Sequence, residues 1–339
     1  MLIPALLCGV LCSGSQARHE CPPNADSFFV YKTRRNGVGG FGSRLWGMAY
    51  AYLVSKLTER VFVLEHPQPR QLSEVFEVRP EYLPQCRGNW GRSLDFRLVD
   101  KTLPLDLLGG KDLAAVWKPY DTVTVQGLNM PCEEQLRRNL HYNLTALGVF
   151  EMTAARQYPW RMGETKRRML QRYRPWISDA WHRLFIKPSA AVHDVVGTQL
   201  AQIESIETTI AIHVRLGGFF ADGSRDQIRT PFEELQWFVD CAKNISASAT
   251  WIVVADNKRA KKWIGERAPI SVITTDWDAV HTDRSKSVSK RQWLETVADW
   301  LLITKATHII QSPSSFSLTA ALWARKIPIM WGERCPLSL

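Results

Sequence analysis

Short, continuous runs of apolar residues alternate with amphipathic segments through the second half of this 339-residue chain. Apolar runs without polar alternation are typical of strands buried on both faces, and helices between such strands produce a parallel sheet. The runs lie at 209–214, 251–255, 272–274, 308–310 and 327–330, and helices are predicted at 232–243, 258–267, about 293–301 and 317–325. The second half is therefore predicted to be an α/β layer structure.

The first half opens with the same pattern. Residues 28–31 and 61–64 are apolar and strand-like, and between them Leu45, Met48 and Tyr52 recur at helical spacing, which predicts a βαβ unit. The stretch from 71 to about 130 is irregular and predicts no particular elements, and 153–183 is predicted as a basic helix interrupted at Pro175. The length suits two domains, predicted at 18–190 and 191–339.

Composition excludes several classes of protein. Hydrophobic residues make up 45% of the chain, which excludes a disordered chain, and the formal charge of +10 favours anionic partners. Nine of the basic residues lie between 155 and 187 with only two acidic ones, a run typical of a solvated helix face. No zinc finger or RNP-type motif is present, so nucleic acid is not an expected partner.

The N-terminus is predicted to be a signal peptide over residues 1–17. An apolar run from Leu2 to Cys12 precedes the small residues Ser15 and Ala17, the pattern that a signal peptidase reads. Because no Lys or Arg lies near Met1, an uncleaved anchor is the alternative. No later run approaches the roughly 20 apolar residues that span a bilayer, so we expect no transmembrane span after cleavage.

The cysteines and two sequons agree with a secretory protein. Wide spacing of the cysteines that follow the signal fits no metal motif and favours disulfides in an oxidising compartment, with the pairing open. Asn143 and Asn244 each begin an N-x-Ser/Thr triplet. We therefore expect the lumen of the secretory pathway, either endoplasmic reticulum or Golgi. The cysteines concerned are Cys21, Cys86, Cys132, Cys241 and Cys335.

Residues with binding chemistry follow several predicted strands, where ligands of open parallel sheets bind. The first group is the G-x-G-x-x-G of Gly37, Gly39 and Gly42, between a strand and a helix. With Glu65 at the end of the next strand, it fits an NAD(P)-type oxidoreductase. A tight structural turn is the competing interpretation.

Three further groups follow strands of the second half. Arg215 ends the run His213-Val214-Arg215 beside two glycines, a setting that suits bidentate contact to a diphosphate. Asp256 follows the next strand and is equally typical of a helix N-cap. The serines of Ser312–Ser317 suit an anion-binding nest or a simple helix cap.

Taken together in this order, the motifs resemble the superfamily of α1,2-, α1,6- and protein O-fucosyltransferases. The resemblance covers about residues 27–331 and is carried by 39–45 with 58–61, by His213-Val214-Arg215, by Val254-Ala255-Asp256 and by Ser314-Ser315-Phe316-Ser317. Within the superfamily, the chain resembles the plant-type and protein O-fucosyltransferase branches. Ser43 stands where members usually carry Asn, and Leu216-Gly217 after the HxR motif is closest to the protein O-fucosyltransferases.

The resemblance implies a GT-B fold, in which two Rossmann-like domains face a cleft. It also implies GDP-fucose as donor, inversion at the anomeric carbon, a glycan or protein acceptor, and neither cofactor nor metal. Arg215 would hold the β-phosphate with help from His213, and Asp256 would contact the nucleoside. The remaining donor-binding residues implied are Gly40, Phe41, Gly42, Ser43, Arg44, Ser314, Ser315 and Phe316.

A general base for the acceptor hydroxyl would complete the reaction. Asp222 and Asp226 in the loop after the HxR motif rank ahead of Glu65 and His66. Asp276-Trp277-Asp278 resembles a DxD metal motif, but it is interpreted as a structural loop. Beside the oxidoreductase, a catalytically silent relative that binds a glycan or protein surface is an alternative.

Overall fold

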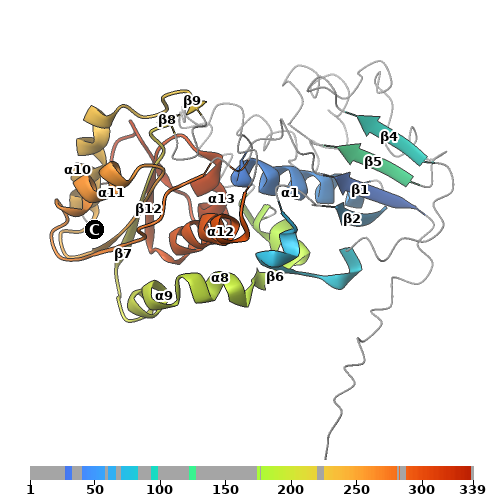
Figure 1. Cartoon of the computed structure of the whole chain (residues 1–339), viewed down its shortest axis with the longest axis horizontal. Helices are drawn as coiled ribbons and strands as arrows, with labels where there is room; N and C mark the ends of the chain where they lie inside the picture. The colour runs from blue at the N-terminus through green and yellow to red at the C-terminus, as the bar shows by residue number, and fades with distance from the viewer. Residues whose placement is uncertain are drawn as a thin grey trace, which may run out of the picture.

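The computed structural model contains two parallel sheets with a helical layer between them (Figure 1). It describes residues 27–32, 40–57, 60–65, 70–82, 93–97, 122–126, 174–175, 177–219, 225–280, 282 and 288–336. The predicted signal peptide, Asn143, most of the basic helix of 153–183 and the cysteines Cys21, Cys86 and Cys132 lie outside these ranges. No helix in the described part of the chain is long and apolar enough to cross a bilayer.

The C-terminal sheet has five parallel strands, each close to its predicted place. Its order is β11-β10-β7-β12-β13, so the strand that comes first in the chain lies in the middle. The next two strands are added on one side and the last two on the other, which is the doubly wound topology. The strands are β7 (Thr209–Val214), β10 (Thr250–Ala255), β11 (Val272–Thr274), β12 (His308–Gln311) and β13 (Ile329–Met330).

Helices cover both faces of this sheet, as its uninterrupted apolar strands require. Ile210, Ile212 and Val214 of β7 belong to the core formed with α10 (Leu235–Ile245) and α11 (Lys258–Gly265). Ala211, which points to the opposite face, belongs to the core formed with α12 (Lys290–Lys305) and α13 (Ser315–Trp323). Successive residues of one strand thus serve two helical layers.

Side-chain caps explain where two of these helices begin. The Asn257 side chain accepts hydrogen bonds from the backbone N–H groups of Arg259 and Ala260 at the start of α11. Ser289 and Gln292 form a reciprocal capping box at the start of α12. The box begins α12 at Lys290, a turn before the first apolar residue from which that helix was predicted.

The N-terminal sheet contains the predicted βαβ unit and two strands that were not predicted. β1 (Phe28–Lys32), α1 (Phe41–Leu57) and β2 (Val61–Glu65) form the unit. β4 (Ser93–Arg97) and β5 (Thr122–Gln126) complete a parallel sheet of order β2-β1-β5-β4. β4 and β5 mix polar with apolar residues, so neither stands out as an apolar run.

The chain crosses between the halves through short elements. β3 (Phe76–Val78) pairs antiparallel with β6 (Phe185–Pro188), and the helices α8 (Ala190–Val195) and α9 (Gly197–Glu204) follow. The two sheets lie on either side of residue 190, and the boundary drawn there stays a prediction.

Aromatic side chains join the two halves into one core. Phe41, at the start of α1, packs edge-on against Trp293 and Trp300 of α12, with ring centroids 5.4 and 5.8 Å apart. Its ring also lies 6.2 Å from that of Phe316 on α13. α1 therefore places its N-terminus beside the N-terminus of α13 (Figure 1).

Candidate active site

The candidate site lies where the C-terminal sheet reverses its strand order. β7 and β12 are neighbours, but the chain leaves them toward different sides, and a crevice opens between the two following loops. Hydrogen bonds hold these loops together: Ser312 N–H donates to the His213 carbonyl (2.9 Å), and Arg215 N–H donates to Ser312 Oγ (2.6 Å). The HxR segment and the serine segment therefore form one structural unit.

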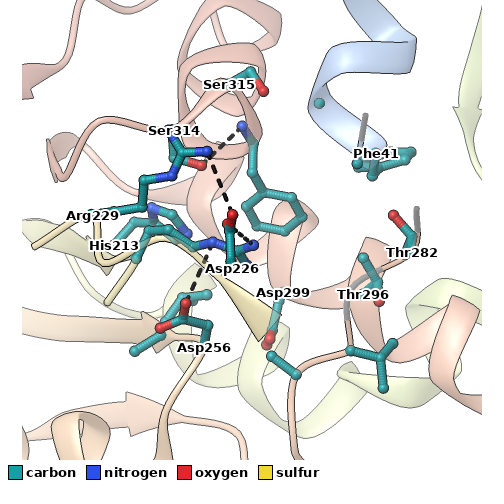
Figure 2. Close-up of a pocket in the computed structure, with 18 of the residues that line it drawn as sticks. Phe41, His213, Asp226, Arg229, Asp256, Thr282, Thr296, Asp299, Ser314 and Ser315 are labelled. Carbon is teal, nitrogen blue, oxygen red and sulfur yellow. Dashed lines mark hydrogen bonds and ion pairs between the residues drawn. The ribbon is translucent and has the colours of Figure 1, made fainter. Parts of the chain in front are cut away.

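A cavity of about 370 Å³ fills this crevice and extends to the N-terminus of α1 (Figure 2). Arg44 is buried in α1 and does not line the cavity, unlike its predicted place on the cleft. Asp222 lies outside the described residues. The predicted residues that do line it are Gly40, Phe41, Gly42, Ser43, His213, Arg215, Asp226, Asp256, Ser314, Ser315 and Phe316.

Arg215 lies between two buried carboxylates. Its Nη2 donates to Asp226 Oδ2 at 3.1 Å, and its Nε lies 3.4 Å from Asp256 Oδ2. One fifth of the Arg215 side chain is exposed, whereas each carboxylate is about 4% exposed. The guanidinium is thus held in one orientation at the cavity wall before any ligand arrives.

Asp256 is a positioning group in this arrangement. Its two oxygens accept hydrogen bonds from the N–H groups of Leu216 and Gly217, each at 2.9 Å, so it fixes the turn that follows Arg215. Burial raises the pKa of the Asp256 carboxyl, and the charge of Arg215 opposes that rise. The predicted contact of Asp256 with the nucleoside stays a prediction, since the contacts described are to the protein itself.

Asp226 has contacts that suit a counter-ion better than a general base. Beside Arg215, it accepts a hydrogen bond from the Gln227 N–H and lies 3.7 Å from Arg229 Nη2. Burial alone would raise its pKa, but the hydrogen bond and charge of Arg215 outweigh burial and lower the pKa below its usual value. A carboxylate made less basic in this way accepts a proton poorly.

His213 contributes a neutral imidazole. Burial, with the charge of Arg215, lowers its pKa to about 3. Its ring lies 5.4 Å from the Phe316 ring, and its buried Nδ1 has no hydrogen-bond partner among the residues that the structure describes. Because buried polar atoms are almost always paired, this nitrogen is available to a bound ligand.

Two helix N-termini meet at the same cavity. Ser43 Oγ of α1 lies 3.2 Å from Ser315 Oγ of α13, and Ser314 caps α13 by accepting the Phe316 N–H. The backbone N–H groups of a helix start carry partial positive charge and bind anions. Together with Arg215, these helix ends make one side of the cavity electropositive.

The contacts of Gly42 explain why the last position of the G-x-G-x-x-G motif is a glycine. A Cβ at Gly42 would lie 2.4 Å from the carbonyl carbon and oxygen of Ser315, so only glycine permits this approach of α1 to α13. Here the close neighbour of the glycine is a protein backbone. Glu65, the other residue of the oxidoreductase interpretation, pairs with Lys32 at 3.1 Å. The structural interpretation of this turn is thus favoured, while Gly37 and Gly39 lie outside the described residues.

Carboxylates of α12 and of the loop after β11 also line the cavity, and those of α12 were missed in the sequence. Glu295 and Asp299 of α12 line it together with Trp277 and Asp278 from the loop after β11. Carboxylates spaced four apart in a helix share one face, a signal that was available in the sequence. No group of three or more His, Cys, Asp or Glu within the described residues has the arrangement of a metal site, and Asp278 pairs with Lys258 at 3.1 Å.

Comparison with known proteins places this architecture. No protein-family model and no curated protein sequence matches the chain. Among solved structures, a point mutant of Arabidopsis thaliana FUT1 in complex with GDP matches 93% of this chain and 71% of its own, with 14% identity and a TM-score of 0.51. The chain therefore has the GT-B fold, which it shares with this FUT1 structure.

Two further structures show lower similarity. NodZ α-1,6-fucosyltransferase from Bradyrhizobium, co-crystallised with GDP, has 14% identity and a TM-score of 0.47 over 88% of this chain and 92% of its own. POFUT1 in complex with GDP has 12% identity and a TM-score of 0.46 over 91% of this chain and 100% of its own. The GT-B fold implied by the resemblance is confirmed by the FUT1 match.

Proposed function

We propose that this chain is an inverting, metal-independent fucosyltransferase that moves L-fucose from GDP-β-L-fucose to a hydroxyl of a glycan or protein. The observation that carries the proposal is the placement of Arg215. Its side chain is held between Asp226 and Asp256 where the sheet reverses its strand order, and it lines the cavity at which the N-termini of α1 and α13 meet. A cation preorganised in this way matches the charge that develops on a departing diphosphate.

In the proposed reaction, the bond between the anomeric carbon and the β-phosphate oxygen breaks while an acceptor oxygen attacks the opposite face. Negative charge develops on the leaving GDP. The Arg215 guanidinium and the backbone N–H groups at the N-terminus of α13 would donate hydrogen bonds to it. His213 is neutral at physiological pH, so it contributes a hydrogen bond, while the positive charge comes from Arg215.

The acceptor hydroxyl gives its proton to a base as the new bond forms. Asp226 is held by arginines and made less basic, so the proposal assigns this step to Asp222, in the loop between β8 (Gly218–Phe219) and β9 (Arg225–Asp226). In the sequence, Asp222 stands seven residues from Arg215 and seven from Arg229, and both arginines line the cavity.

Release of GDP from GDP-fucose across a panel of glycan and peptide acceptors tests the proposal. We expect acceptor-dependent release, and stabilisation by GDP but not by NAD(P) in a thermal-shift assay. Stabilisation by NAD(P) alone would support the oxidoreductase, and binding of GDP-fucose without release under any acceptor would support the silent relative. GDP-mannose serves as the control donor, since it differs only in the sugar.

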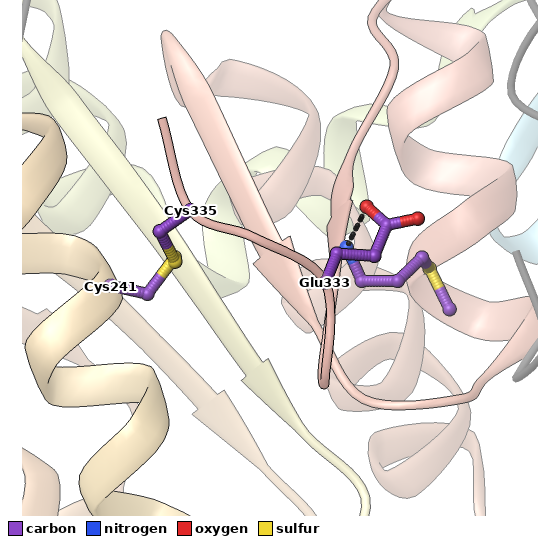
Figure 3. The surroundings of a disulfide bond; sticks show 4 residues. Cys241, Glu333 and Cys335 are labelled. Carbon is purple, nitrogen blue, oxygen red and sulfur yellow. Dashed lines mark hydrogen bonds between the residues drawn. A yellow bond between two sulfur atoms is a disulfide. The ribbon is translucent and has the colours of Figure 1, made fainter. Parts of the chain in front are cut away.

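We also propose that the protein works in the lumen of the secretory pathway. Cys241 of α10 and Cys335 near the C-terminus are joined in a disulfide, with Cα atoms 5.4 Å apart (Figure 3). Asn244 lies exposed in the last turn of α10, in the sequon Asn244-Ile245-Ser246. Both features suit an oxidising, glycosylating compartment.

Peptide mapping without reductant, on protein from a eukaryotic secretory host, tests this location. We expect a Cys241–Cys335 cross-linked peptide and a mass shift on glycosidase treatment that Asn244→Gln reduces and Asn143→Gln reduces separately. Retention of the untagged full-length protein in the cytosol, with free thiols at both cysteines, would contradict it.

A further inference from the structure

A buried ammonium group contacts the loop after β11, which contributes Trp277 to the cavity lining. Lys261, on α11, is only 5% exposed, although its neighbour Lys262 has a side chain that is 80% exposed. Its Nζ donates to Thr275 Oγ1 at 2.8 Å and to the Thr275 carbonyl at 3.1 Å. It also lies 3.4 Å from the Trp277 carbonyl. Lys261 therefore binds the backbone of the loop that follows β11.

A buried carboxylate binds the same loop from the other side. Asp299 of α12 accepts the hydroxyl of Thr275 at Oδ1 (2.8 Å) and the indole N–H of Trp277 at Oδ2 (3.2 Å). Burial raises the pKa of Asp299, and the charge of Lys261 opposes the rise. Thr275 Oγ1 thus bridges Lys261 to Asp299, and each end of the bridge also binds Trp277.

Burying such a network costs more folding free energy than a purely apolar core would require. Removing an ammonium and a carboxylate from water costs several kcal/mol each, which their attraction offsets only when the geometry is good. An apolar cluster of the same volume would usually be as stable. What the polar network adds is orientation, because both the backbone and the ring of Trp277 have a fixed partner.

Trp277 is the residue that this orientation serves. It is half-buried against the main core and lines the cavity, with its indole N–H bound to Asp299. The described residues of its loop, 275–280 and 282, belong to no strand or helix that would hold it. A tryptophan on such a loop would change rotamer when free and would lose that freedom on binding a ligand, at a cost in affinity.

We propose that Lys261, Thr275 and Asp299 are positioning residues that hold Trp277 as a preorganised wall of the nucleotide cavity and thereby set the affinity for the donor nucleotide. The inference rests on the proposed function, in which this cavity takes GDP-fucose. Because these residues act on donor binding, replacing one of them should raise the KM for donor and leave kcat at saturating donor nearly unchanged.

The first test compares two adjacent lysines by calorimetric titration of GDP. We expect Lys261→Met to weaken GDP binding on the order of 10-fold, and Lys262→Met to leave it unchanged. Thr275→Ser, which keeps the hydroxyl, should bind like the wild type, whereas Thr275→Val should bind like Lys261→Met. The threonine pair serves even if Lys261→Met fails to fold. A lower melting temperature with wild-type GDP affinity in Thr275→Val would overturn the inference.

The second test asks whether Asp299 acts through Trp277. Asp299→Leu and Trp277→Phe each remove the hydrogen bond to the indole, so in a double-mutant cycle the combined variant should bind GDP no more weakly than the weaker single variant. Independent, multiplying losses would overturn the inference. If the wild type binds no GDP, the proposed function fails; wild-type binding with unchanged affinity in all variants removes this inference alone.

Discussion

The carboxylate of Asp226 lies 3.1 Å from the guanidinium of Arg215 and joins the end of β7 to β9. A strand-end arginine that opens into a cleft is expected to be replaceable without effect on the fold. Here its removal would leave the carboxylates of Asp226 and Asp256 buried without their nearest cation. Activity and stability are therefore coupled at Arg215, and the variants that test it must separate them.

Arg215→Lys keeps the charge and loses the planar fork. We expect transfer to fall roughly 100- to 1000-fold, close to the loss in Arg215→Ala, because a single ammonium cannot reproduce two directed hydrogen bonds. The melting temperature should fall less in Arg215→Lys than in Arg215→Ala, because the alanine variant leaves both buried carboxylates without their nearest cation. Arg291→Lys, at an exposed position of α12, is the control. Transfer at the wild-type rate by Arg215→Ala would refute the role of Arg215.

The variant Asp226→Asn tests whether Asp226 acts as a counter-ion of Arg215 or as the general base. As a counter-ion, Asp226 only orients Arg215, so we expect about a 10-fold loss of transfer, a higher KM for donor and an unchanged pH profile. As a base, its loss would cost roughly 100- to 10,000-fold and remove the acidic limb of the pH–rate profile. Rates measured from pH 5 to pH 9 decide between the two.

The lowered pKa of His213 predicts that the stability of the protein depends on pH. Its pKa is about 3 in the folded protein and about 6.5 in the unfolded chain. The unfolded chain therefore binds the additional proton between these values, and stability falls as the pH drops below about 6.5. Between pH 7 and pH 5 this one group should remove about 2 kcal/mol. Urea unfolding of His213→Gln should show a pH dependence smaller by that amount, and an unchanged dependence would contradict the neutral imidazole.

Gly42→Ala should disturb the contact between the two halves. The added methyl group would lie 2.4 Å from the Ser315 backbone, which cannot rotate away as a side chain would. We expect a loss of about 1–3 kcal/mol in unfolding free energy and weaker GDP binding, because Ser314 and Ser315 stand at the N-terminus of α13. Gly197→Ala, at the start of α9, has open space around it and should be neutral or slightly stabilising. Equal stability of the two variants would argue against the close approach.

Local pattern was enough to predict the elements of the second sheet. Its strands are buried on both faces, so β7 and β10 are apolar at most positions and stand out from the segments around them. The same reason explains why β4 and β5 were missed, since their sequences mix the two residue types. The motifs at strand ends, including Arg215 and Ser314, could likewise be found because a strand end is a local feature.

Only the tertiary structure decided what those residues contact. The order of the strands brings the loop after β7 beside the loop after β12, and Ser43 meets Ser315 across 272 positions of sequence. Asp226 was predicted as a base because its place in a loop was all that the sequence shows, whereas its contacts with Arg215 and Arg229 favour a counter-ion. The sequence by itself determined which side chains stand at strand ends, because that depends on neighbours along the chain. Their pKa values and partners depend on burial and on charges brought together by folding, which no local pattern contains.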